Sequence, residues 1–187
     1  FCNRHLPSAH VTVVEIDANV IALRAHFQIP PDGADLRVIH GDGARYVEGL
    51  GDSAEFPDVL LVDAYDRDGI SRSIAEPEFI ENSRRILGDD GVFVMNLAAH
   101  ESDSTLHVER IRKVFGDPVI PVTVGWGGNM VVFAGPALRD RRRLEAAPAN
   151  ARRVERTLDL DFRILPGLVR KHLQQAQYEP AQLDPAQ

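Results

Sequence analysis

The stretch VTVVEID at residues 11–17 decides the fold of this chain. Four β-branched residues, which favour strands, precede Glu15, Ile16 and Asp17. A helical pattern begins directly after Asp17, with apolar residues spaced three and four apart at Val20, Leu23 and Phe27. A strand that passes at once into a helix is the repeating unit of α/β folds.

Further β runs and helical patterns alternate along the chain. The β runs are Leu36–His40, Asp58–Asp63 and Val92–Leu97, and the apolar centre of the second is typical of a parallel strand covered on both faces. Helices are predicted from Pro77, with one face formed by Phe79, Ile80, Ser83, Ile86 and Leu87, and over Ser102–Phe115. The segment from Ala64 to Ala75 is predicted to be a loop. Val119–Val124 and Met130–Ala134 flank glycines and predict a closing antiparallel hairpin on a mostly parallel sheet.

Composition restricts the classes of function. The 187 residues suit one domain, and no apolar run approaches the roughly 18 residues that a membrane span needs. The net charge of −7 argues against a nucleic-acid partner and suits a cationic substrate. One cysteine, Cys2, excludes an internal disulfide and fits a reducing, cytoplasmic location. The seven histidines lack the spacing of metal ligands, so no metal is predicted.

Polar residues end four of the predicted strands: Glu15, Asp42, Asp63 and Asn96. The carboxyl ends of parallel strands meet at one edge of a sheet, where α/β proteins bind their ligands. A carboxylate such as Glu15 accepts two hydrogen bonds, which matches the two donors of a ribose diol. The alternative is that loops after strands are simply polar.

The aspartates at and after the strand ends also have structural interpretations. Asp17 is interpreted as a helix N-cap. Asp42, followed by Gly43, either accepts a hydrogen bond from an adenine amino group or caps a turn or helix. Asp63 and Asp66, three residues apart, either bind and deprotonate an ammonium group or belong to a solvated acidic loop.

These motifs together resemble the spermidine synthase (polyamine aminopropyltransferase) family. The resemblance covers about residues 1 to 135 and rests on VVEID, GDG at 41–43, DVLLVDAYD at 58–66 and GVFVMNL at 91–97. It implies a Rossmann-like, class I methyltransferase-type α/β fold, flanked by helices. By resemblance, Glu15, Ile16, Asp42, Gly43 and Asp63 bind the nucleoside. Asp63 and Asp66 are the implied catalytic acids, and Tyr65, Asp66, Asn96 and Trp126 hold the amine.

The resemblance also implies a reaction. An aminopropyl group would pass from decarboxylated S-adenosylmethionine to a small amine such as putrescine, with neither nucleic acid nor membrane as partner. Two alternatives stay open: a methyltransferase that uses S-adenosylmethionine, and a non-catalytic relative in which Asp63 is tied into an internal salt bridge. Arg67, in the catalytic loop, and Trp126, where family members often carry tyrosine, keep the last alternative open.

Three parts are predicted along the chain: a nucleoside-binding core over residues 1–136, C-terminal helices over 137–177 and a flexible tail over 178–187. The arginine-rich segment from 139 to 156 is interpreted as a solvated helix face. An amphipathic helix over Phe162–Leu173 would cover the core or join a homodimer. The family's first strand and glycine-rich loop have no counterpart in residues 1–10, so a chain that truly began at Phe1 is expected to be inactive.

Overall fold

The computed structural model describes residues 2–6, 8–51, 56–66, 69–99, 103–124, 128–158, 167 and 171. Contacts divide the chain into two compact units. The first comprises Phe1–Phe56 and Ala64–Ile86, and the second Pro57–Asp63 and Leu87–Gln187. The predicted boundaries at 136 and 177 stay predictions, and the tail and the helix over Phe162–Leu173 lie outside the described residues, apart from 167 and 171. The two units are considered separately.

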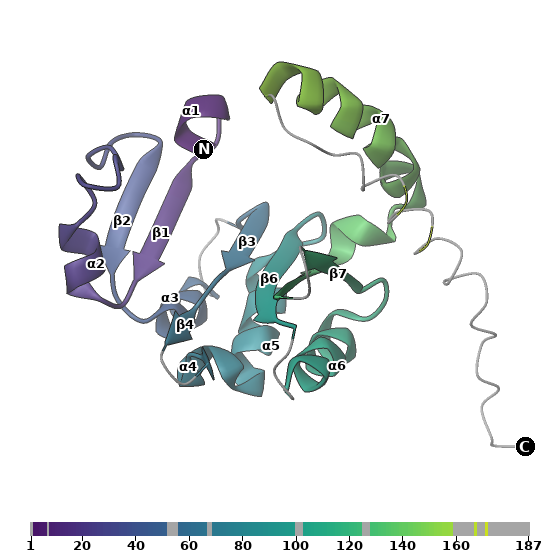
Figure 1. Ribbon diagram of the computed structural model, residues 1–187. Helices are drawn as coiled ribbons and strands as arrows, with labels where there is room; N and C mark the ends of the chain where they lie inside the picture. The colour runs from purple at the N-terminus through teal and green to yellow at the C-terminus, as the bar shows by residue number, and fades with distance from the viewer. Residues whose placement is uncertain are drawn as a thin grey trace, which may run out of the picture. The chain divides into compact units, whose positions relative to one another are not determined.

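The first unit contains a parallel pair of strands (Figure 1). β1 (Val11–Glu15) runs beside β2 (Leu36–His40), in a register that pairs Val11 with Leu36 and Glu15 with His40. Both strands lie where the sequence predicts them. The register places the last residues of the two strands next to each other, so Glu15 and His40 share the carboxyl end of this sheet.

Two short helices accompany this sheet, and the second is shorter than predicted. α1 is Cys2–His5 and α2 is Ala18–Ala22. Turns follow α2, and Gln28 has a φ of 57°, which a continuing right-handed helix excludes. The predicted apolar face is not buried, because Val20, Leu23 and Phe27 are 44%, 49% and 59% exposed. The prediction of a helix reaching Phe27 was therefore wrong.

The rest of the first unit is mostly helical. α3 (Gly43–Leu50), which the sequence analysis missed, packs against α5 (Pro77–Ile86). The predicted buried face of α5 is confirmed, and the buried Ser83 hydroxyl donates to the Phe79 carbonyl at 2.7 Å. The predicted loop before α5 contains a two-residue antiparallel pair, β4 (Tyr65–Asp66) with β5 (Gly69–Ile70), and α4 (Arg72–Ala75).

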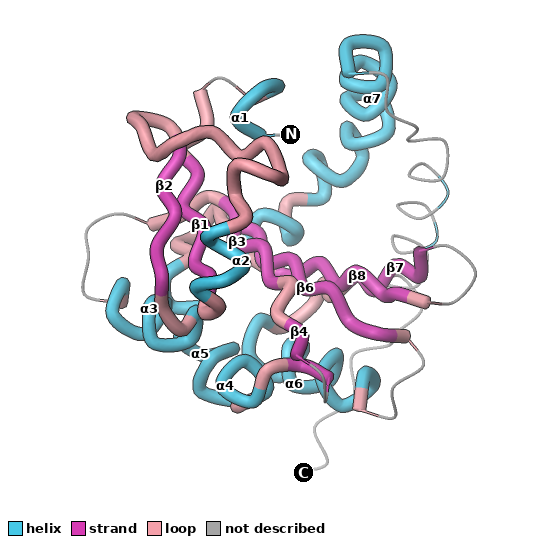
Figure 2. The backbone as a smooth tube through the Cα atoms, turned by 60° about the vertical axis from the view of Figure 1, so that its left-hand side comes forward, coloured by secondary structure: helices cyan, strands magenta, loops and turns pink. Residues whose placement is uncertain are grey.

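The second unit is built on a four-stranded sheet with the order β3–β6–β8–β7 (Figure 2). β3 (Val59–Val62) is parallel to β6 (Val92–Ala98). β8 (Asn129–Ala134) is antiparallel to both β6 and β7 (Ile120–Val124), which confirms the predicted hairpin. The fold is α/β with parallel pairs and a C-terminal antiparallel hairpin, as predicted, and its parallel strands fall into two sheets.

The core of the second unit lies on one face of β6. Phe93, Met95 and Leu97 alternate with less buried residues and are at most 1% exposed. α6 (Ser104–Phe115) contributes Phe115, whose ring centroid lies 5.1 Å from that of Phe93. Asn96 therefore belongs to the opposite face of the strand, together with Val92, Val94 and Ala98.

β3 differs from the prediction of a strand covered on both faces. It is an edge strand of its sheet, and Val59 and Leu61 are 52% and 66% exposed, whereas Val62 is buried. The apolar run reflects high β propensity, but only one neighbouring strand pairs with it among the described residues. The prediction of two covered faces was wrong.

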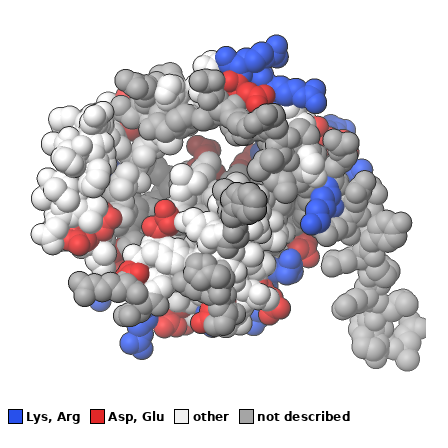
Figure 3. Space-filling model, in the orientation of Figure 1, with Lys and Arg blue, Asp and Glu red and all other residues white. Residues whose placement is uncertain are grey.

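In the second unit, η1 (Pro136–Arg139) and the basic helix α7 (Arg141–Leu158) follow β8. Figure 3 shows Lys and Arg side chains gathered over α7. The arginines of α7 are exposed, as expected of a solvated face: Arg141, Arg142, Arg143, Arg152, Arg153 and Arg156. Within the described ranges, the chain has no helix that is both long and apolar enough to cross a membrane.

Candidate functional site

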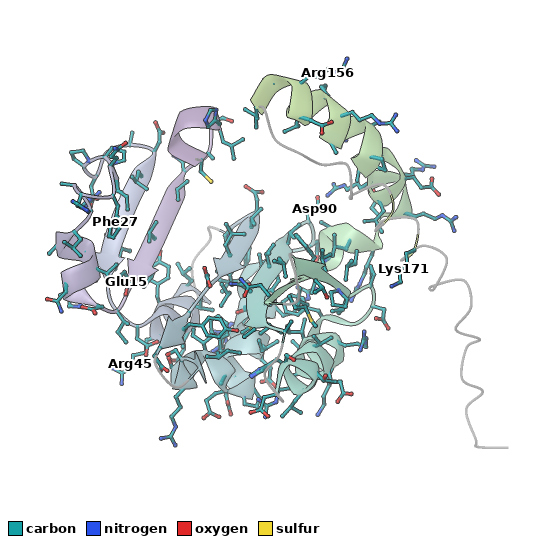
Figure 4. All side chains as sticks on the ribbon, viewed as in Figure 1. Glu15, Phe27, Arg45, Asp90, Arg156 and Lys171 are labelled. Carbon is teal, nitrogen blue, oxygen red and sulfur yellow. The ribbon has the colours of Figure 1, made fainter. Side chains whose placement is uncertain are left out.

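Glu15 lies at the carboxyl end of β1, as Figure 4 shows. Its Oε1 accepts a hydrogen bond from the backbone N–H of Asp17 at 2.8 Å. The side chain is half-buried, and its second carboxylate oxygen has no hydrogen bond to any described residue. The turn after β1 therefore fixes the Glu15 side chain through one oxygen and leaves the other without a hydrogen bond to the described residues.

His40 is a feature of this sheet edge that the sequence analysis missed. Its Nε2–H donates to the Ile16 carbonyl at 3.1 Å, and the Gly41 N–H donates to the Glu15 carbonyl at 3.0 Å. These two bonds tie the ends of β1 and β2 together. Ile16 itself has an exposed side chain (62%), so a nucleoside contact there is sterically open. The position of His40 at a predicted strand end, opposite Glu15, was the available signal.

Asp17 and Asp42 both cap helices. Asp17 precedes α2 and accepts from the Asn19 N–H at 2.8 Å, which confirms its interpretation as an N-cap. Asp42 precedes α3, and its Oδ1 accepts from the N–H groups of Ala44 at 2.7 Å and Arg45 at 3.3 Å. The capping alternative for Asp42 is thus what the structure describes, and contact with adenine stays a prediction.

Gly43 opens α3 directly after Asp42. A Cβ atom at this position would meet one neighbour, Ile74 Cδ1 at 3.7 Å, which is an ordinary van der Waals contact. The packing of the unit therefore does not require glycine here.

Asp63 and Asn96 meet in the second unit. Val62 pairs with Met95, so Asp63 and Asn96 are the next residues along two adjacent parallel strands. Asn96 Nδ2 donates to Asp63 Oδ1 at 3.0 Å. Asp63 is exposed and forms no ion pair with any described residue, so the internal salt bridge expected of a non-catalytic relative is not present in this part of the chain.

Two further predicted site residues, Tyr65 and Asp66, lie in the segment that follows β3. Asp66 and Tyr65 form β4 in the first unit, and both side chains are exposed. The division between the units falls between Asp63 and Ala64. Arg67 and Trp126, which carried the doubts about catalysis, lie outside the described residues. Among the described residues, no group of three or more histidine, cysteine, aspartate or glutamate side chains is placed to hold a metal ion.

Comparison with known protein families identifies the family to which this chain belongs. A sequence model of the spermine/spermidine synthase domain matches residues 3–122. The chain belongs to this family. The match includes Glu15, Asp42, Asp63 and Asn96, the four strand-end residues that carried the resemblance.

Relatives bear two kinds of name. The polyamine aminopropyltransferase of Neisseria meningitidis serogroup A is 30% identical over 88% of this chain and 62% of its own length. That of Chromobacterium violaceum is 32% identical over 87% of this chain and 61% of its own length. An eEF1A lysine and N-terminal methyltransferase of Xenopus laevis is 30% identical over 73% of this chain and 21% of its own length. The chain thus spans about three fifths of the aminopropyltransferases it matches.

Solved structures agree on the fold. Human methyltransferase-like protein 13 in complex with SAH has a TM-score of 0.65 at 19% identity, over 99% of this chain and 78% of that one. A spermidine synthase in complex with the transition-state analogue AdoDATO has a TM-score of 0.55 at 21% identity, over 73% of this chain and 51% of that one. At these identities the likeness establishes the methyltransferase-type α/β fold that was predicted.

Proposed function

We propose that this protein transfers an aminopropyl group from decarboxylated S-adenosylmethionine to a small amine of the putrescine type. The observation that carries the proposal is the state of Asp63. This carboxylate ends β3, is exposed, accepts a hydrogen bond from the Asn96 amide and is not neutralised by an ion pair within the described ranges. Membership of the spermine/spermidine synthase family and relatives named polyamine aminopropyltransferase support the same reaction.

The chemistry needs a base beside the amine. An alkyl ammonium has no lone pair, so it must lose a proton before its nitrogen can attack. The neutral amine then attacks the carbon next to the sulfonium. A C–N bond forms, the C–S bond breaks, and the electron pair of that bond leaves with methylthioadenosine. Asp63 is assigned as the acceptor of the amine proton, since an exposed carboxylate that no ion pair among the described residues neutralises can both attract a cation and take up its proton.

The nucleoside would bind at the strand ends of the first unit. Glu15 has one carboxylate oxygen fixed by the Asp17 N–H and the other available to the ribose hydroxyls. Asp42 is assigned to the adenine amino group, with Ile16 and Gly43 beside it. Because packing alone does not require glycine at position 43, close approach of a ligand is a reason for the absence of a side chain there.

Of the residues that the resemblance places at the amine, Asp66, Tyr65 and Trp126 are assigned to hold it, and Asn96 is assigned instead to contact Asp63. Asp66 and Tyr65 are exposed on β4, so both are accessible to a small cation. A second carboxylate near the amine would hold its positive charge, and a tyrosine or tryptophan face adds a cation–π attraction.

A second candidate function is methyl transfer from S-adenosylmethionine. The observation in its favour is the Xenopus laevis relative named a methyltransferase, which is 30% identical over 73% of this chain, against 30% over 88% for the Neisseria meningitidis aminopropyltransferase. The two reactions differ at the amino-acid end of the donor. A site lined by acids repels the carboxylate of S-adenosylmethionine and favours the decarboxylated donor, and Asp63 is such an acid.

One experiment separates these functions. The purified protein is incubated with putrescine and either decarboxylated S-adenosylmethionine or S-adenosylmethionine, and the amine products are identified by mass spectrometry. We expect spermidine and methylthioadenosine in the first reaction and no methylated amine in the second. Methylated product with S-adenosylmethionine alone would replace the proposal by methyl transfer. The absence of any product with either donor, while the protein is folded, would contradict both.

Partners and location complete the proposal. We infer a homodimer in the cytoplasm, acting on small amines without a metal ion, a nucleic acid or a membrane. The net charge of −7 supports the attraction of a polycation. Sedimentation in solution tests the dimer.

A further inference from the structure

The contact between Asp63 and Asn96 carries an inference that deepens the proposed function and rests on it. We propose that Asn96 is a positioning residue, which holds Asp63 Oδ1 so that Oδ2 faces the amine and receives its proton. The two residues are direct neighbours on the parallel strands β3 and β6, and the Asn96 Nδ2–H donates to Asp63 Oδ1 at 3.0 Å.

The chemical type of this partner matters. Hydrogen bonds to a carboxylate are directional, so a single donor restricts the rotation of the group. An arginine in the same place would also neutralise the carboxylate, as Arg24 does for Asp32 in the first unit at 2.8 Å. A neutral amide orients Asp63 and leaves its negative charge in place for the substrate cation.

The orientation of the Asn96 amide is set by Asp63. With Nδ2 toward the carboxylate, the amide donates; turned by half a rotation, its oxygen would face a carboxylate oxygen, and two acceptors repel. In the observed orientation Asn96 Oδ1 is buried and has no hydrogen-bond partner among the described residues. The Asn96 side chain therefore donates a hydrogen bond to Asp63, while its own oxygen, Oδ1, has no donor among the described residues.

This unpaired acceptor distinguishes a chemical role from a structural one. A buried oxygen without a partner is destabilising, so an apolar side chain of similar size would suit the strand at least as well. Val92 and Val94, on the same face of β6, are such residues. Stability alone does not account for asparagine at position 96, whereas orientation of Asp63 does.

The test compares stability with turnover in the Asn96→Leu variant, with Asn96→Ala as a smaller second variant. Asn150→Leu, at an exposed position of α7, is the matched control. Thermal unfolding, calorimetric affinity for methylthioadenosine, and kcat and KM for putrescine with decarboxylated S-adenosylmethionine are measured on each protein.

We expect the kcat of Asn96→Leu to fall about 10-fold or more, since a misplaced reacting group costs that much. Its KM for putrescine should change less than about threefold, because the amine is bound elsewhere. Its unfolding midpoint should not fall, and methylthioadenosine should bind as to the parent. Asn150→Leu should match the parent in kcat, KM and affinity.

Three results would overturn the role of Asn96. One is an unchanged kcat in both variants; another is a kcat that falls only together with the unfolding midpoint and nucleoside affinity, which indicates a structural role. The third is a raised KM with unchanged kcat, which means that Asn96 binds the amine itself. A parent protein that makes no spermidine would instead overturn the proposed function, and this inference with it.

Discussion

The carboxylates at the strand ends of the two units are held in different ways. In the first unit, Glu15 and Asp42 accept hydrogen bonds from the backbone N–H groups of the turn or helix that follows each strand. In the second unit, Asp63 accepts from a side chain, the amide of Asn96 on the neighbouring strand. An acid that accepts from backbone N–H groups also stabilises the turn or helix that supplies them. An acid that accepts from a side chain is held in place, but no helix or turn relies on it.

This difference in hydrogen bonding suits Glu15 and Asp42 to one role and Asp63 to another. Acids bound to backbone are rigid and suit the recognition of fixed hydroxyl and amino groups on a nucleoside. An exposed acid held by one neutral amide keeps its charge and an oxygen for a proton. Under the proposed function, the acids of the first unit therefore bind and Asp63 of the second unit reacts. Two predictions test these roles, and a third, with a smaller effect, concerns an acid away from the strand ends.

The largest effect is expected from Asp63→Asn. Asparagine has nearly the same shape but cannot take a proton from the amine, so kcat should fall by about 10²- to 10⁴-fold, the usual contribution of a general base. Methylthioadenosine should bind about as tightly as to the parent. Steady-state assays of spermidine formation and calorimetry measure both quantities.

Asp58→Asn is the control for this variant, because Asp58 is also exposed and directly precedes the other end of β3. It should keep the parent's kcat. If Asp63→Asn retained more than about a tenth of the parent's kcat, Asp63 would not be the base.

An intermediate effect is expected from a pair of capping variants, Asp42→Ala and Asp17→Ala. Each removes an N-cap, so each should lower the free energy of unfolding by about 1 kcal/mol. Only Asp42→Ala should also weaken methylthioadenosine binding, because it removes the proposed hydrogen bond to adenine. The expected loss of binding free energy is about 1 kcal/mol, or about fivefold in affinity. Urea unfolding and calorimetry separate the two effects. Equal losses of affinity in both variants would mean that Asp42 is only a cap.

The smallest effect concerns an acid of the first unit that lies away from the strand ends. The hydrogen bond from Arg24 to Asp32 lowers the pKa of the Asp32 carboxyl below its ordinary value, and the Val38 N–H adds to this. A lowered folded-state pKa gives stability that is present above the unfolded-state value and is lost as the pH falls below about 4. Asp32 is solvent-exposed, so this contribution is small.

Asp32→Asn should therefore reduce slightly the loss of stability between pH 5 and pH 3, in the range of ordinary aspartate titration. The dependence of the thermal unfolding midpoint on pH, compared between Asp32→Asn and the parent, measures this difference. If the unfolding midpoint of Asp32→Asn fell with pH as steeply as that of the parent, the bond between Arg24 and Asp32 would contribute nothing to stability.

Sequence patterns predicted the strands well and the helices less evenly. The strand at Leu36–His40 and the helices α5 and α6 followed from short apolar runs and clear helical spacing. α3 was missed because it begins at Gly43, contains Gly49 and buries only Val47, so its apolar spacing is weak. α2 was predicted too long, because Leu23 and Phe27 fit a helical face that the turns after Ala22 never bury.

The features of the candidate site were also only partly predictable from the sequence. The residue types at the strand ends were visible in the sequence because each follows a β run directly. Their hydrogen-bond partners were less accessible. The caps are local and follow from Asp17 and Asp42 themselves, whereas the bond between Asp63 and Asn96 depends on the register of two strands that lie 33 residues apart. Spacing along the chain carries no such information.

Nucleoside binding at Glu15 is tested by calorimetry of methylthioadenosine and of S-adenosylmethionine with the purified protein and with its Glu15→Ala variant, and Glu48→Ala is the exposed control. We expect methylthioadenosine to bind the parent more tightly than S-adenosylmethionine does, Glu15→Ala to abolish this binding, and Glu48→Ala to leave it unchanged. Tighter binding of S-adenosylmethionine would favour methyl transfer, and equal methylthioadenosine affinity in the parent and Glu15→Ala would exclude Glu15 from the nucleoside site.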